Sequence, residues 1–173
     1  MEMWELVARE RCRDTLARYT HAGDRYLLEE FGSAFCEDGV LEIRGVEPIV
    51  GRAAIVATFS GDTGSLQAQM EAAVDSPPSA PPATTTPSRS SPTSPPASGR
   101  HIVRHNVTNI RFESVSPTGI TVASYFLVVT RNGVDHVGRY RDRLVPVADD
   151  WLIAHRFVSV DWHAPHSLFG GSD

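Results

Sequence analysis

The fold is decided by four alternating stretches in the second half of the chain, which read HIVRHNVTNIRF (101–112), TVASYFLVVT (121–130), HVGRYRDRLVPV (136–147) and WLIAHRFVSVD (151–161). Alternation of apolar and polar residues is typical of strands with one buried face. Turn residues separate the stretches, and Asn132-Gly133 is the strongest hairpin signal among them. Consecutive strands joined by tight turns predict an antiparallel meander.

The first half of the chain shows helical spacing instead. Apolar residues recur every three or four positions over residues 4–19, which predicts a first helix. Residues 21–23 interrupt this pattern, and a second helix is predicted from Arg25 to Phe35, with Asp24 as its N-cap.

Three shorter elements complete this half: a turn at 37–39, a strand at 40–44 and a third helix at 51–59. Helices followed by strands are typical of an α+β domain. We therefore predict an α+β fold in which a cone-shaped, curved antiparallel sheet wraps around three N-terminal helices. A pocket is expected between the sheet and the helices, where small ligands tend to bind.

A segment of low complexity separates the two halves. Residues 76–99 contain eight Pro, seven Ser and four Thr among 24 residues. Such a segment cannot bury enough apolar surface to offset the entropy lost on ordering. Because neither flank carries a complete core, we interpret residues 1–173 as one domain. Within it we expect a low-complexity insertion at 62–99, disordered from residue 76, and a flexible C-terminal tail at 163–173.

The composition argues against several classes of function. The formal net charge is −5 and the chain contains no Lys, which disfavours binding to a nucleic-acid backbone. No apolar run approaches the roughly 18 residues of a membrane span, and the N-terminus lacks the apolar segment of a signal peptide. We expect a cytoplasmic protein with no membrane or nucleic-acid partner. Cys12 and Cys36 are then reduced thiols, placed in the predicted helices.

Tyr19 and Asp24 are the first candidate catalytic residues, five positions apart at the first helix junction. A carboxylate enclosed by apolar side chains can act as a general acid or base, and a Tyr hydroxyl can donate to a substrate oxygen. The alternative is structural, with Asp24 as a plain N-cap and Tyr19 as a core aromatic. Spacing alone favours this structural alternative.

The predicted strands supply the next candidates. His101 and His105 share one face of their strand, and an imidazole on the concave face could move protons at neutral pH. Otherwise they are ordinary strand histidines. The same period places Gly138, Tyr140 and Asp142 on one face, so Tyr140 is a candidate lining residue.

Motifs for a cofactor or a metal are missing from the sequence. His163 and His166 flank a Pro and have no Cys or acidic partner at a suitable spacing. The chain also lacks a nucleophile elbow, a phosphate-binding loop and a dinucleotide fingerprint. We expect no cofactor and no metal, and chemistry limited to proton transfer or to binding alone.

The order of these motifs resembles a known family. The sequence gives in turn Tyr19-x4-Asp24, Gly51-Arg-x2-Ile55, Arg-His105-Asn-Val-Thr-Asn109, Ser124-Tyr125, Gly-Arg-Tyr140-x-Asp142 and Asp-Trp151-x-Ile-x2-Arg156. Apart from residues of about 62–99, the chain resembles the SnoaL-like branch of the nuclear transport factor 2-like superfamily. That branch is similar to scytalone dehydratase, bile acid 7α-dehydratase and the ketosteroid isomerases.

The resemblance implies acid–base chemistry without a cofactor in a deep apolar pocket. Asp24 would orient His105, which would remove a proton next to a carbonyl, while Tyr19 would hydrogen-bond the carbonyl oxygen. The second pocket histidine of scytalone dehydratase corresponds to the stretch at 138–141, where Tyr140 stands or a partner is missing. The candidates for binding the substrate are Tyr140, His101, Asn109, Phe35 and Tyr125.

The sequence therefore predicts a dehydratase, isomerase or cyclase. Its substrate would be a hydrophobic, ring-containing small molecule such as a polyketide or a steroid. The resemblance also implies a homodimer formed through the open face of the sheet. The alternative is a non-catalytic module of the same fold that binds a small molecule or serves as a dimeric structural subunit.

Overall fold

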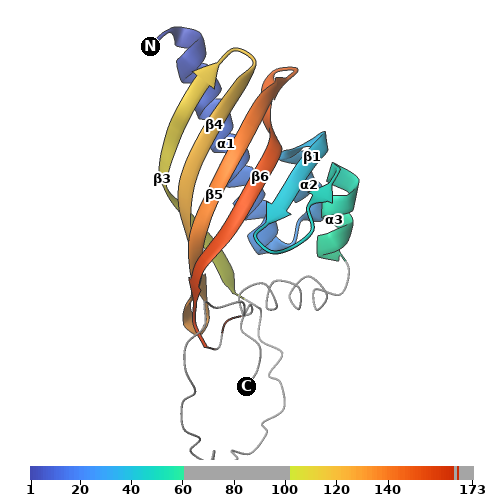
Figure 1. Ribbon diagram of the computed structural model, residues 1–173, viewed down its shortest axis with the longest axis vertical. Coiled ribbons are helices and arrows are strands. Elements are labelled where there is room, and N and C mark those ends of the chain that lie inside the picture. The colour runs from blue at the N-terminus through green and yellow to red at the C-terminus, as the bar shows by residue number, and fades with distance from the viewer. Residues whose placement is uncertain (61–101, 166, 168–173) are drawn as a thin grey trace, which may run out of the picture.

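The computed structural model describes residues 1–60, 102–165 and 167 (Figure 1). Within them the chain forms α1 (Met3–Arg25), α2 (Leu28–Ser33), β1 (Phe35–Ile43), β2 (Ile49–Val50), α3 (Arg52–Ser60), β3 (Val103–Ser116), β4 (Gly119–Thr130), β5 (Gly133–Val147) and β6 (Asp150–His163). The insertion expected at 62–99 and the disorder expected from residue 76 both lie outside the described residues. So does most of the expected tail at 163–173, of which Ala164 and Ser167 are buried.

The strands form one sheet in the order β2-β1-β6-β5-β4-β3. The four long strands β3 to β6 pair antiparallel in sequence order, which confirms the meander. The prediction of a wholly antiparallel sheet is wrong, because β1 pairs with β6 in parallel. No hairpin links these two strands, and the long path between them leaves either direction open. The sheet is therefore mixed.

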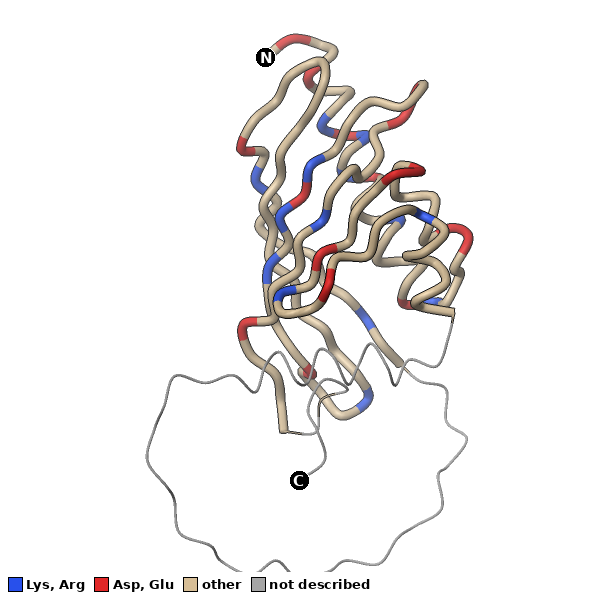
Figure 2. The backbone as a smooth tube through the Cα atoms, turned by 45° about the vertical axis from the view of Figure 1, so that its right-hand side comes forward, with Lys and Arg blue, Asp and Glu red and all other residues tan. Residues whose placement is uncertain are grey.

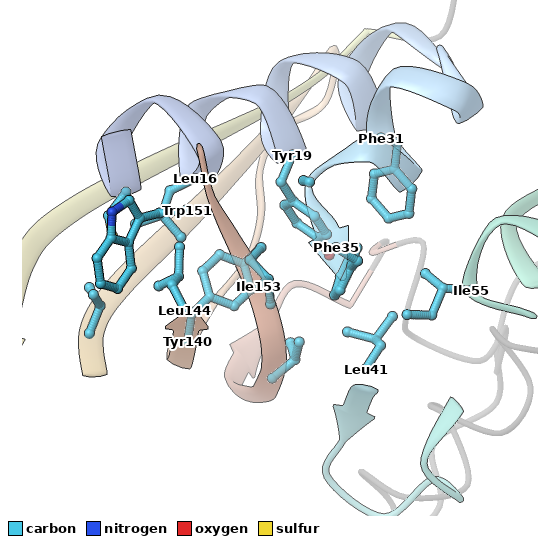
Figure 3. Close-up of a cluster of buried hydrophobic side chains, with 14 of the residues drawn as sticks. Leu16, Tyr19, Phe31, Phe35, Leu41, Ile55, Tyr140, Leu144, Trp151 and Ile153 are labelled. Carbon is cyan, nitrogen blue, oxygen red and sulfur yellow. The ribbon is translucent and has the colours of Figure 1, made fainter. Parts of the chain in front are cut away.

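The first helix covers one face of the curved sheet. Figure 1 shows α1 crossing behind β3 to β6, with α2 and α3 beside β1 at one end. The contact side of α1 buries Cys12, Leu16 and Tyr19 against inward residues of the long strands such as Leu144 and Ile153 (Figure 3). The helix is tied to β6 by the Thr15 hydroxyl, which donates to the Trp151 carbonyl at 2.7 Å.

Two boundaries in the helical half differ from the sequence prediction. Asp24 is not the N-cap of a second helix, because α1 continues through residues 21–23 to Arg25. Ala22 is fully buried there, so tertiary packing overrides the low helix propensity of Gly23. The chain instead reverses at Tyr26, which has a left-handed backbone with φ of 60°.

The first strand replaces the expected helix end and turn. Phe35 begins β1 instead of ending a helix, and Cys36 therefore lies in a strand. The expected turn at 37–39 is an irregularity in the pairing of β1 with β6. A Cβ on Gly39 would stand 3.0 Å from the Ile153 carbonyl oxygen, so the close approach of the two backbones favours glycine. Cys12 and Cys36 are both buried and free.

Figure 2 shows that both basic and acidic residues occur along the strands and the helices. No helix in the described residues is long and apolar enough to cross a membrane.

Candidate active site

The carboxylate of Asp24 binds His105 at the open edge of the sheet. The His105 ring nitrogen Nδ1 lies 2.6 Å from Asp24 Oδ1. The His105 backbone N–H also donates to both carboxylate oxygens, at 3.2 Å to Oδ1 and 3.0 Å to Oδ2. The Asp24 side chain is 8% exposed and that of His105 is 25% exposed. The carboxylate is thus buried, and the imidazole keeps a route to solvent or ligand.

The fold explains why these two residues meet. Asp24 lies in the last turn of α1, and β3 is an edge strand that packs beside this helix. A backbone N–H on an edge strand has no strand partner on its outer side. The Asp24 carboxylate accepts from this unpaired backbone N–H of His105 and also holds the imidazole ring of the same residue.

A second histidine lies next to the first. The rings of His105 and His136 have centroids 6.3 Å apart and are nearly perpendicular. His136 Nδ1 lies 2.8 Å from Asp135 Oδ2, and the Ser167 hydroxyl donates to the same oxygen at 2.7 Å. Burial lowers the pKa of His136 from 6.5 to about 4, although Asp135 opposes the shift. His136 is therefore uncharged at neutral pH.

Sequence reasoning missed His136, although a signal for it was present. Counting back by two from Tyr140 along β5 places residue 136 on the buried face, where the burial pattern also puts it. The resemblance directed attention to 138–141 instead. His136 lies two residues before that stretch.

A small pocket opens beside the Asp24–His105 pair. It has a volume of about 120 Å³, and its walls come from the end of α1, from α2, from the end of α3 and from β3. Aromatic side chains dominate the walls, which are formed by Tyr19, Thr20, Gly23, Tyr26, Leu28, Phe31, Phe59 and His105.

Tyr19 connects the pocket to a buried charge pair. The Arg156 guanidinium carbon lies 4.0 Å from the centre of the Tyr19 ring and 4.3 Å from that of Tyr140. Arg156 donates to both oxygens of Asp142, at 2.7 and 2.9 Å. Burial raises the pKa of the Tyr19 phenol, an effect that Arg156 reduces, and burial raises that of Tyr140 well above 10.0. Both phenols keep their protons at neutral pH and can donate them.

The remaining candidates are not gathered at this pocket. Phe35 packs in the core with its ring centre 5.8 Å from that of Tyr19 (Figure 3). Asn109 is exposed, with φ of 51°, where the β3–β4 register shifts. Tyr125 is 54% exposed on the opposite face of the sheet. The Tyr140 ring centre lies 6.2 Å from that of Tyr19, and Tyr140 is not among the residues that line the pocket. His101 lies outside the described residues.

Metal binding has no support among the described residues. They contain no cluster of three or more His, Cys, Asp or Glu side chains that could hold an ion. His163 Nδ1 lies 3.2 Å from the Ala164 carbonyl oxygen. His166 falls outside the described part of the chain.

Comparisons with known proteins identify a family to which this chain matches and solved structures that it resembles. Residues 4–157 match the model of a family described as SnoaL-like domain. A solved structure from Catenulispora acidiphila, in complex with S-DNPA, is 25% identical, covers 88% of this chain and 92% of its own, and has a TM-score of 0.59. A candidate scytalone dehydratase from Novosphingobium aromaticivorans is 20% identical over 92% of this chain and 90% of its own, with a TM-score of 0.63.

A third solved structure, ActVI-ORFA from Streptomyces coelicolor, is 17% identical. It covers 88% of this chain and 96% of its own, with a TM-score of 0.61. No curated protein sequence matches this chain. The structural likenesses establish a shared fold.

Proposed function

The chain belongs to the SnoaL-like domain family, as its motifs predicted, and from that premise we propose that it is a cofactor-independent acid–base enzyme. Its reaction is a dehydration, isomerisation or cyclisation of a hydrophobic, ring-containing small molecule. The observation that carries the proposal is the contact of 2.6 Å between Asp24 and the His105 ring at the edge of an apolar pocket. A carboxylate at one nitrogen of an imidazole orients the other nitrogen as a base.

The proposed first step is proton removal next to a carbonyl group of the substrate. The hydrogen bond to Asp24 assigns the ring proton of His105 to Nδ1. The lone pair of the ring that can accept a proton then lies on Nε2. Nε2 takes the proton, the electron pair of the C–H bond moves toward the carbonyl oxygen, and Asp24 stabilises the imidazolium that forms.

The Tyr19 phenol is the proposed donor to the oxygen that becomes negative in this step. Tyr19 and His105 line the same pocket, and the raised pKa of the buried phenol keeps its proton in place. A positioned donor of this kind stabilises an enolate more than the ketone it comes from. Return of the proton from His105 to a departing hydroxyl gives an alkene and water, and its return to another carbon gives an isomer.

His136 is proposed to assist as an uncharged neighbour of His105. Because its pKa is lowered to about 4, His136 adds no second positive charge beside a protonated His105.

The relatives support the proposal at the level of the fold, since one solved structure is a candidate scytalone dehydratase and another holds S-DNPA.

The proposal is tested by turnover of a panel of steroid, bile-acid and polyketide alcohols, together with smaller cyclic hydroxy-ketones. The active compound is then used to compare the wild type with His105→Ala. The matched control is His155→Ala, because His155 also contacts a carboxylate, Glu42 at 2.9 Å, but lies away from the pocket. The proposal expects turnover to be lost only in His105→Ala. Equal turnover in the two variants would refute it.

The expected homodimer also stays a proposal. The outer face of the sheet exposes Tyr125 and Trp162, at 54% and 51% of their surfaces, and we propose that it contacts a second copy. Sedimentation of the wild type and of Tyr125→Arg tests this, and a monomeric wild type would refute it.

A further inference from the structure

The size of the pocket limits what it can hold. Its volume is about 120 Å³. An apolar cavity of about 150 Å³ holds benzene, and drug-sized ligands occupy sites of about 300–1,000 Å³. The pocket is partly open, so its walls enclose a single ring, and further fused rings must either extend past the rim or displace a wall.

The walls differ in how firmly they are held. Tyr19, Thr20 and Phe31 are buried, so their displacement would disrupt the packing of α1 and α2. Tyr26 is 59% exposed and Phe59 is partly exposed. These two residues, which we call the outer wall, form the side of the pocket that could yield. The Phe59 ring packs on that of Phe31 with centroids 4.9 Å apart.

Tyr26 has a backbone conformation that its residue type disfavours. Its φ of 60° is left-handed, and it caps α1 at a position where glycine is usual. The side chain makes a specific contact from there, because its hydroxyl donates to the Phe59 carbonyl at 2.7 Å. That carbonyl lies in the last turn of α3, where helix carbonyls lack partners within the helix. The bond therefore ties the end of α3 to the end of α1.

We propose that Tyr26 and Phe59 form a size filter that restricts the site to compact, single-ring compounds. The hydrogen bond holds Phe59 against Phe31 and keeps the outer wall in the path of larger ring systems. The chemical class of the substrate, a monocyclic hydroxy-carbonyl compound, rests on the proposed function; the size limit is a property of the pocket itself.

The test measures binding of phenol, 2-naphthol and 9-phenanthrol, which present one hydroxyl on one, two or three fused rings. The ring proton signals of His105 report binding at this site, and they are assigned with His105→Ala. The variants are Phe59→Ala, Phe59→Leu and Tyr26→Phe. Tyr125→Phe removes a hydroxyl on the opposite face and serves as the matched control.

In the wild type we expect affinity to fall by about tenfold or more from phenol to 9-phenanthrol, since an apolar pocket discriminates between ligands that differ in carbon groups by such factors. The fall should disappear in Phe59→Ala, shrink in Phe59→Leu and Tyr26→Phe, and persist in Tyr125→Phe. If 9-phenanthrol shifts the His105 signals of the wild type at the same concentration as phenol, or if the folded Phe59→Leu and Tyr26→Phe proteins keep the full fall, the filter is refuted. Absence of turnover with an intact size series would refute the proposed reaction alone.

Discussion

Replacing Asp24 by Asn changes one oxygen of a buried carboxylate to an amide group and keeps the shape of the side chain. The native carboxylate accepts from His105 Nδ1 at 2.6 Å and from the His105 backbone N–H at 3.0 and 3.2 Å. Asn has one acceptor oxygen to divide between these donors. If that oxygen stays on the backbone N–H, the amide NH₂ faces Nδ1 and forces the proton of the ring onto Nε2.

The expected loss follows from that change of tautomer. With its proton on Nε2 the imidazole has no lone pair directed at the substrate, and such a change lowers kcat on the order of 10⁴-fold. The cost in stability is smaller. A hydrogen bond to a charged group contributes about 1.5–3 kcal/mol against about 0.5–1.5 for a neutral one, so the free energy of unfolding should fall by about 1–2 kcal/mol.

Three measurements check this prediction on the active compound of the panel. They are kcat, the nitrogen chemical shifts of His105, and urea unfolding. Glu42→Gln is the matched control, since Glu42 also contacts a histidine but is 39% exposed, where such pairs contribute little. Unchanged turnover in Asp24→Asn would refute the mechanism, as would a large loss with Nε2 still unprotonated.

Three further changes test other parts of the site. Tyr19→Phe should keep the fold and lower kcat by about 10²–10³-fold, which is the usual effect of removing one donor to a developing oxyanion. Steady-state kinetics measures this loss, and turnover equal to the wild type would exclude Tyr19 as the donor. Arg156→Met should lower the free energy of urea unfolding by about 3–5 kcal/mol, because it leaves Asp142 as an unpaired charge in the core. Adding Asp142→Leu should recover most of this loss. A double variant no more stable than the single one would contradict this. Since the unfolded chain binds a proton at His136 below 6.5 and the folded chain binds it only below about 4, the free energy of unfolding should fall by up to ~3 kcal/mol as pH drops through that window. His136→Gln should remove this slope in urea titrations at several pH values, and a slope equal to that of the wild type would contradict the assignment.

The sequence was most informative where structure is local. Alternating residues and the Asn132-Gly133 turn predicted the meander, because a hairpin fixes both the direction and the neighbour of its strands. The parallel pairing of β1 with β6 could not be predicted in this way, since no short connection joins them. The length of α1 was missed for a related reason. Asp24 has the residue type of an N-cap, but Ala22 is fully buried in the core, and this packing favours a helical turn there.

The residues of the candidate site also differ in how well the sequence predicted their positions. The motif order brought attention to Tyr19, Asp24 and His105, and the structure brings all three to one pocket or its edge. Asn109 came from the same motif order but lies where the pairing of β3 with β4 is irregular, and it is exposed. A motif does not reveal such an irregularity, which changes the face that a strand position occupies.

Asp24 serves the fold and the site through the same three contacts, and this decides how its effects can be separated. The carboxylate closes a backbone donor on the edge strand and orients the ring of the same residue. Asp24→Asn therefore disturbs both functions together. His105→Ala removes the ring but keeps the backbone N–H and its bond to Asp24, so the strand edge stays closed. The stability that Asp24→Asn loses beyond His105→Ala measures the structural contact, and activity lost equally in both assigns the catalytic effect to the oriented imidazole.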